Sequence, residues 1–86
     1  MKVLIPTPLY DYTGGQREFQ SESTSLKELL LELDRRFPGI RFRMVDEQDK
    51  IRGHIRVFVD GVAVHKLETP LTTVDEVLIV QALSGG

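Results

Sequence analysis

The chain has 86 residues, with 11 lysines and arginines, 13 aspartates and glutamates, and a formal net charge of −2. This length suits one small domain, and the near balance of charge argues against a nucleic-acid or anionic-membrane ligand. The chain lacks cysteine, which excludes disulfides, thiolate metal sites and a cysteine nucleophile, and it lacks a long apolar run, so we expect a cytoplasmic protein without a membrane span.

The first half of the chain is predicted to form a hairpin that leads into a helix. Residues 2–6 and 16–21 have the alternating pattern of short strands and are expected to pair. Residues 10–15, which lie between them and end in two glycines, are predicted to be a turn. Ser25 and Glu28 then have the spacing of a capping box, so a helix is expected with Ser25 as its N-cap.

This helix is expected to run to about Phe37, where Pro38 and Gly39 end it. Its apolar residues recur at i, i+3, i+4, i+7 and i+11, which places them on one stripe that faces the core. They are Leu26, Leu29, Leu30, Leu33 and Phe37.

The pattern between this helix and the next strand is weaker. Residues 40–46 are predicted to form a short helix or an irregular crossing anchored by Phe42 and Val45, and the polar residues 47–53 a loop. Residues 54–59 alternate, which indicates a strand with one face toward the core. The residues expected to face inward are Ile55, Val57 and Val59, and those expected to face outward are Arg56 and Phe58.

Two further strands are expected after this one. Asp60-Gly61 is a hairpin signal that joins residues 54–59 to a strand at 62–64. Residues 77–83 are mostly apolar on both faces, which suits a strand in the interior of the sheet, beside the first strand. A helix that crosses one face of a mixed sheet lets all these elements share one core.

The predicted fold class is therefore α+β, a β-grasp (ubiquitin-like) arrangement in which a mixed sheet of about four to five strands packs on one main helix. We expect residues 1–83 to form this single domain and residues 84–86 a flexible tail. Gly85 and Gly86 have no side chain to pack and lose more backbone entropy on ordering than other residues. They are either a frayed end or a thin tail that enters the active site of another protein, where the α-carboxylate of Gly86 reacts.

A second apolar set is expected on the sheet face away from the helix, because its members alternate with the inward-facing residues. It consists of Phe58, Leu78 and Val80, with Leu4 and Pro6 nearby. Loops around Tyr10 or Phe42 are one way to cover these side chains. The other explanation is an exposed apolar surface on which a partner docks.

The remaining candidates lack a chemically specific pattern. His54 and His65 are separate and have no cysteine or acidic neighbour at ligand spacing, so no metal site is predicted. Basic residues are enriched in the middle of the chain and form either a solvated face or a patch for an acidic partner. They are Arg35, Arg36, Arg41, Arg43, Lys50, Arg52 and Arg56.

In their order along the chain, these motifs resemble the ubiquitin-like sulfur-carrier family, which includes ThiS and MoaD. The resemblance covers essentially the whole chain, from the first strand through residues 26–39 and 75–77 to the terminal diglycine. Residues 5–9 (IPTPL) and 13–16 (TGGQ) look most like the CysO type, the carrier for cysteine synthesis.

The resemblance implies a carrier that is not itself an enzyme and that binds no cofactor or metal. The implied partner is a ubiquitin-activating-enzyme-like adenylyltransferase/sulfurtransferase, which uses ATP to adenylylate Gly86 before sulfur replaces AMP and leaves a thiocarboxylate. An acceptor synthase, for which a cysteine synthase-like enzyme is one candidate, takes the sulfur, and a metalloprotease that trims the tail is a further candidate partner. Neither nucleic acid nor membrane is an expected partner. The residues expected to bind partners are Phe58, Leu78, Val80 and Leu83, and those expected to form the tail are Ser84, Gly85 and Gly86.

The acceptor pathway of such a carrier stays open and can be that of cysteine, thiamine, molybdopterin or a related product. Two alternative functions also stay open. A ubiquitin-like protein modifier would use the same Gly86 carboxylate to form an isopeptide with a lysine. A TGS-like regulatory or RNA-binding module is the other alternative, although the diglycine and the lack of a basic and aromatic surface array argue against it.

Overall fold

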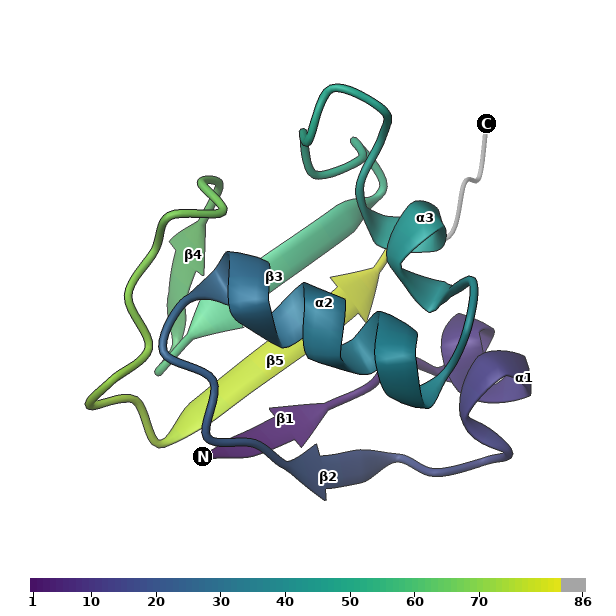
Figure 1. Ribbon diagram of the computed structural model, residues 1–86, viewed down its shortest axis with the longest axis horizontal. Coiled ribbons are helices and arrows are strands. Elements are labelled where there is room, and N and C mark those ends of the chain that lie inside the picture. Colours follow the sequence, from purple (N-terminus) through teal and green to yellow (C-terminus); the bar gives the residue numbers. More distant parts are fainter. Residues whose placement is uncertain (83–86) are drawn as a thin grey trace.

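The computed structural model describes residues 1–82 and shows a mixed sheet of five strands with its main helix across one face (Figure 1). In chain order the elements are β1 (Lys2–Leu4), the 3-10 turn η1 (Thr7–Leu9), α1 (Tyr10–Thr13), β2 (Glu18–Gln20), α2 (Leu26–Arg36), α3 (Ile40–Met44), β3 (Ile55–Val59), β4 (Val62–Val64) and β5 (Glu76–Gln81). The strands lie in the order β2-β1-β5-β3-β4, with β5 parallel to β1 and antiparallel to β3. This confirms the predicted β-grasp, with the last strand beside the first in the interior of the sheet.

The core lies between α2 and the sheet. The four leucines of the predicted stripe, Leu26, Leu29, Leu30 and Leu33, are each at most 1% exposed. They share one buried cluster with the inward-facing strand residues, among them Val3, Val57, Val77 and Ile79. Burying one leucine contributes roughly 1.5–3 kcal/mol, so packing of this stripe holds α2 in place more than its intrinsic helix propensity does.

The N-terminus of α2 is capped at the predicted residue. The Glu28 amide donates to the Ser25 hydroxyl (3.2 Å), as in a capping box. The Glu28 carboxylate accepts from the hydroxyl and the amide of Thr24 (2.7 and 3.0 Å). In a regular capping box it would accept from the amide of the N-cap residue, Ser25, which follows Thr24. The two hydrogen bonds from Thr24 lower the pKa of Glu28 below its ordinary value, because they favour the ionised carboxylate.

The segment before β2 differs from the prediction. Residues 10–15, expected to be a turn, contain the helix α1, which ends at Gly14 with a φ of 63°. Leu9 and Thr13 are buried, and the Thr13 hydroxyl donates to the Gln16 carbonyl (2.8 Å). Tertiary contacts therefore fix a helix that is too short to show a period in the sequence.

The segment after α2 forms a short helix, one of the two predicted alternatives. Ile40 and Met44 anchor α3, and Val45 beside them is fully buried, as predicted. Phe42, the other expected anchor, is 57% exposed, so that prediction is wrong. The reason is the helical period, which turns residue 42 about 200° away from residue 40 and so to the opposite side of α3.

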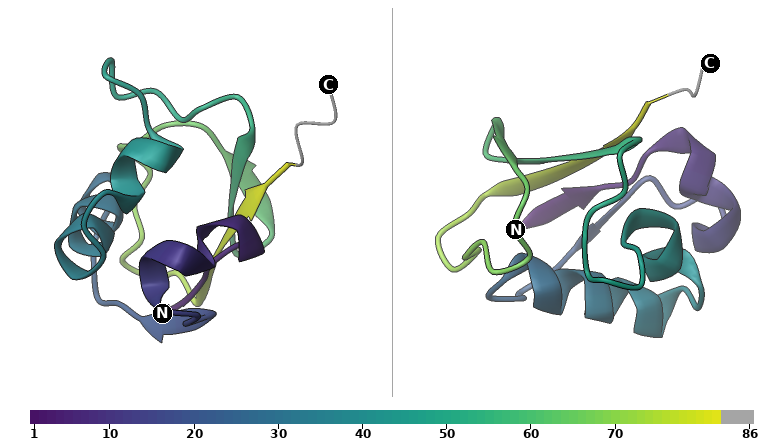
Figure 2. Two further views of the ribbon diagram at one scale, coloured as in Figure 1. Left: turned by 90° about the vertical axis from the view of Figure 1, so that its right-hand side faces the viewer. Right: turned by 90° about the horizontal axis from the view of Figure 1, so that it is seen from above.

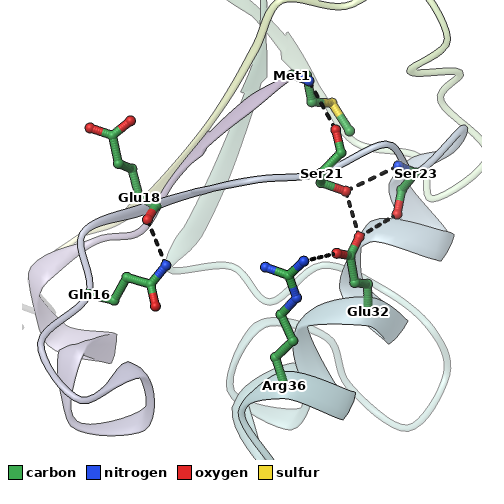
Figure 3. A network of polar contacts seen from close by, with 7 residues as sticks. All are labelled: Met1, Gln16, Glu18, Ser21, Ser23, Glu32 and Arg36. Atoms are coloured by element: carbon green, nitrogen blue, oxygen red, sulfur yellow. Dashed lines mark hydrogen bonds and ion pairs between the residues drawn. The ribbon is translucent and has the colours of Figure 1, made fainter.

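A polar network fastens the connection between β2 and α2 (Figure 3). The Glu32 carboxylate accepts from the hydroxyls of Ser21 and Ser23 (2.5 and 2.8 Å) and pairs with Arg36 (2.8 Å). The Met1 amino group donates to the Ser21 carbonyl (2.9 Å), which ties β1 to the same corner. Burial raises the pKa of Glu32, but the two serine hydrogen bonds and the charge of Arg36 outweigh burial, so the pKa lies below its ordinary value. The carboxylate is thus held in its charged form.

Candidate docking surface

The sheet face away from α2 carries a row of side chains that crosses all five strands. Strand pairing places five residues side by side in this row, in the order Glu18, Leu4, Leu78, Phe58 and Ala63. Val80 points to the same face, two residues beyond Leu78 on β5. We call the apolar members, which are Leu4, Phe58, Ala63, Leu78 and Val80, the outer patch.

Most of the outer patch is half-buried, although it does not belong to the core. Leu4, Phe58, Leu78 and Val80 all have intermediate exposure, whereas their neighbours Val57, Val77 and Ile79 are buried. Side chains that are paired across strands lie about 5 Å apart, so the members of the patch cover one another in part. The alternation that was expected to direct Phe58, Leu78 and Val80 outward is therefore observed, while their role in partner binding stays a prediction.

Charged residues border the outer patch. On one side, Lys2 of β1 pairs with Glu76 of β5 (3.7 Å). On the other side, Arg56 of β3 lies opposite Val80. A centre with an aromatic ring and aliphatic side chains, surrounded by charges, is a common composition of protein interfaces.

The helices leave this face of the sheet uncovered. α2 and α3 pack together on the other side of the sheet, and α1 lies at one end of it (Figure 2). Tyr10 packs against the core, and Phe42 is an exposed residue of α3. An uncovered sheet face with apolar side chains is a candidate interaction surface.

The chain leaves the sheet next to the outer patch. The Ala82 amide donates to the His54 carbonyl (2.7 Å), so the last described residue is still held beside the start of β3. Val80 lies only two residues before it. The tail residues Ser84, Gly85 and Gly86 and the expected contact residue Leu83 lie outside the described residues, so their roles stay predictions.

Within residues 1–82 the structure shows neither a cluster of metal-binding side chains nor a helix that could span a membrane. Among residues 1–82 there is no group of three or more side chains that could hold a metal ion. His54 and His65 line two different cavities. In the same part of the chain, every helix is too short or too polar to cross a bilayer.

The basic residues in the middle of the chain do not form one patch. Arg36 is paired with Glu32 and Arg41 with Asp49 (2.8 and 3.0 Å), at separate places on the surface. Three more of these basic residues line one groove on the β4 side of the sheet. Two lysines that were not among the predicted basic residues line the same groove. These groove residues are Lys50, Arg52 and Arg56, joined by Lys27 and Lys66.

Known proteins resemble this chain over nearly its whole length. The model of the ThiS family matches residues 3–86. Sulfur carrier protein CysO from Mycobacterium tuberculosis (strain ATCC 25618 / H37Rv) is 29% identical over 98% of this chain and 96% of its own length. The crystal structure of the Amycolatopsis orientalis BexX/CysO complex contains a chain with 31% identity and a TM-score of 0.88, matched over 99% of this chain and 98% of that one. SAMP1 from Haloferax volcanii has a TM-score of 0.77 at 21% identity over 100% of this chain and 98% of its own, a likeness that concerns the fold alone.

Proposed function

Because this chain belongs to the ThiS family, we propose that it is a sulfur carrier protein whose C-terminal Gly86 carboxylate accepts and delivers sulfur. The observation that carries the proposal is that the family match runs through the terminal diglycine and not only through the folded domain. Likeness to CysO carriers over nearly the whole chain supports the same function. In this proposal the chain is a protein substrate of its partners and not an enzyme.

The proposed chemistry takes place on the carboxylate of Gly86. A carboxylate is ionised at neutral pH and therefore resists attack by nucleophiles. An activating enzyme joins it to the AMP part of ATP with release of pyrophosphate, which creates a good leaving group. A sulfur donor then displaces AMP, and the thiocarboxylate that results delivers one sulfur atom to an acceptor enzyme. The partner supplies the ATP-binding site and the acid–base groups, which agrees with a tail made of glycine and serine.

The outer patch is the proposed surface on which these partners dock. Two of its members, Leu78 and Val80, lie on β5, the strand that precedes the tail, so a partner that binds the patch also receives Gly86. A relative of this chain forms a complex with BexX, which supports docking to a second protein. Resemblance to CysO makes a cysteine synthase-like enzyme our first candidate for the acceptor.

Replacing Phe58 with alanine tests the docking surface. We expect the variant to bind the activating enzyme at least tenfold more weakly, which corresponds to about 1.4 kcal/mol, because a buried aromatic anchor is lost from the centre of the interface. The stability of the domain should change little, since Phe58 lies outside the core. Calorimetric titration beside a denaturant melt measures both quantities.

The matched control is Val62→Ala, which truncates an apolar side chain of β4 that is 65% exposed and outside the outer patch. We expect this variant to bind like the parent protein. A large loss of stability in Phe58→Ala with unchanged affinity would place Phe58 in the core and remove the outer patch from the proposed interface.

A ubiquitin-like modifier is the alternative that uses the same carboxylate. The structural likeness to SAMP1 carries no functional argument at 21% identity. The two functions differ in their products, because a modifier leaves Gly86 in an amide bond to a lysine of another protein. Tryptic peptides of other proteins in which a lysine carries residues 67–86 of this chain, the segment that follows its last basic residue, Lys66, would favour the modifier.

A further inference from the structure

A second surface feature is a groove at the edge of the sheet, beyond the end of β4. It has a volume of about 740 Å³. Its lining residues come from the loop of residues 49–53 before β3, from the start of β3, from the connection of residues 65–68 after β4, and from Lys27 of α2. The charged residues that line it are Lys27, Lys50, Arg52, Arg56 and Lys66, with Asp49 and Glu68 as the acidic ones.

The groove is positively charged although the chain as a whole is negative. Five cationic side chains line it against two acidic ones, in a chain with a net charge of −2. The Asp49 carboxylate is already paired with Arg41 (3.0 Å), so Glu68 is the acidic group left to offset the five cations. Lys27, Lys50 and Lys66 are exposed, and none of the ion pairs found within residues 1–82 involves them.

The floor of the groove is apolar. Ile55 and Leu67 are 2% and 6% exposed, and Ile51 is half-buried against the core. The groove therefore combines cations on its walls with aliphatic side chains beneath them. A ligand that matches it carries both negative charge and apolar groups.

The N-terminus of α2, beside the groove, supplies no free amide for a phosphate at its first two residues. The first amides of α2 would be free at an open helix end, but here they donate to the connection that follows β4. The Leu26 amide donates to the Thr69 carbonyl (2.9 Å) and the Lys27 amide to the Leu67 carbonyl (2.8 Å). The helix N-terminus is thus closed to an anion.

The two arginines of the groove are also oriented by the protein itself. The Arg52 Nε atom donates to the Phe42 carbonyl (2.7 Å), and its guanidinium lies over the Phe42 ring (4.6 Å). The Arg56 guanidinium donates to the carbonyls of Gly53 and Ile55. These cations provide positive charge along the walls, but they do not converge on one point as they would around a phosphate.

We propose that this groove binds an acidic, extended segment of a partner protein, in which carboxylates alternate with apolar side chains. The carboxylates contact the cations from the two segments that line the groove, and the apolar side chains contact Ile51, the half-buried member of the floor. Arg56 connects the groove with the outer patch, because it lies opposite Val80 on the outer face and its guanidinium reaches the edge of the groove. The proposal goes beyond sulfur transfer, since it concerns a surface that any partner with such a segment can use.

The test is a titration of the 15N-labelled full chain with an octapeptide in which glutamate and valine alternate, followed by NMR. We expect amide shifts confined to residues 49–56 and 65–68, and a dissociation constant that rises with ionic strength. The double variant Lys50→Gln/Lys66→Gln should raise the dissociation constant at least fivefold. The control Arg17→Gln/Arg35→Gln removes the same charge from exposed positions outside the groove and should change it less than twofold.

Four results would overturn the proposal. One is the absence of amide shifts in these residues at millimolar peptide. The second is equal weakening by the control variant, which would indicate general charge attraction. The third is equal binding of a peptide with lysine in place of glutamate. The fourth is displacement of the peptide by an equimolar amount of inorganic pyrophosphate, which would identify a site for small anions. None of these results depends on sulfur transfer, so failure here leaves the carrier function untouched.

Discussion

We expect deletion of Gly86 to abolish activation of this protein while its fold stays intact. The deletion moves the terminal carboxylate back by one residue, which is roughly 3.5 Å of extended chain. A misplacement of even 1 Å at a reacting group can cost about 100-fold in rate, so exchange of pyrophosphate with ATP by the activating enzyme should fall at least that far. The thermal unfolding midpoint should not change, because the core lies within residues 1–82.

The control for this deletion is Ser84→Ala, which keeps the length of the tail and its diglycine. We expect it to support exchange within a few-fold of the parent protein. Gly86→Ala, which adds one methyl group beside the reacting carboxylate, should behave like the deletion. Normal exchange by the deletion variant would contradict the carrier function.

The second large effect concerns the core. Leu30→Ala should lower the free energy of unfolding by about 2–5 kcal/mol, as other truncations of buried leucines do. Leu30 is 1% exposed in the middle of α2 and packs in the cluster that joins the helix to the sheet. Since a domain of this size has a total stability of only about 5–10 kcal/mol, the variant should be partly unfolded under conditions in which the parent is stable.

Lys27→Ala is the comparison on the same helix, because Lys27 is exposed and lies outside the leucine stripe. We expect a change within about 0.5 kcal/mol for this surface position. Urea denaturation followed by circular dichroism gives both values. Equal midpoints for the two variants would show that the leucine stripe does not carry the packing of α2.

The elements predicted best from the sequence are those whose local pattern and tertiary role agree. α2 has a leucine at every core position and a cap at Ser25, and β3 alternates without a break. α1 was not predicted, because four residues are too few to show a helical period. Its glycine at position 14 has the positive φ of a helix C-cap, which in sequence is indistinguishable from a turn glycine.

The outer patch could be predicted from the sequence in large part, whereas the groove could not. The alternation along each strand was enough to direct Phe58, Leu78 and Val80 to one face with Leu4 nearby, but the membership of Ala63 in the outer patch depends on which strands pair and in what register. The basic groove depends on tertiary structure even more. Its lysines come from α2, from the loop before β3 and from the connection after β4, and no local pattern links them.

The measurement that tests the central claim most directly is the intact mass of the protein purified from its native cell, followed by fragmentation of the C-terminal peptide. The sulfur-carrier function predicts a fraction with a mass higher by about 16 Da, the replacement of one oxygen by sulfur, located at Gly86. The same fraction should lose the added mass when the acceptor enzyme is supplied with its substrate. A C-terminal peptide that is unmodified in every preparation, including after incubation with the activating enzyme, ATP and a sulfur donor, would contradict the proposed function.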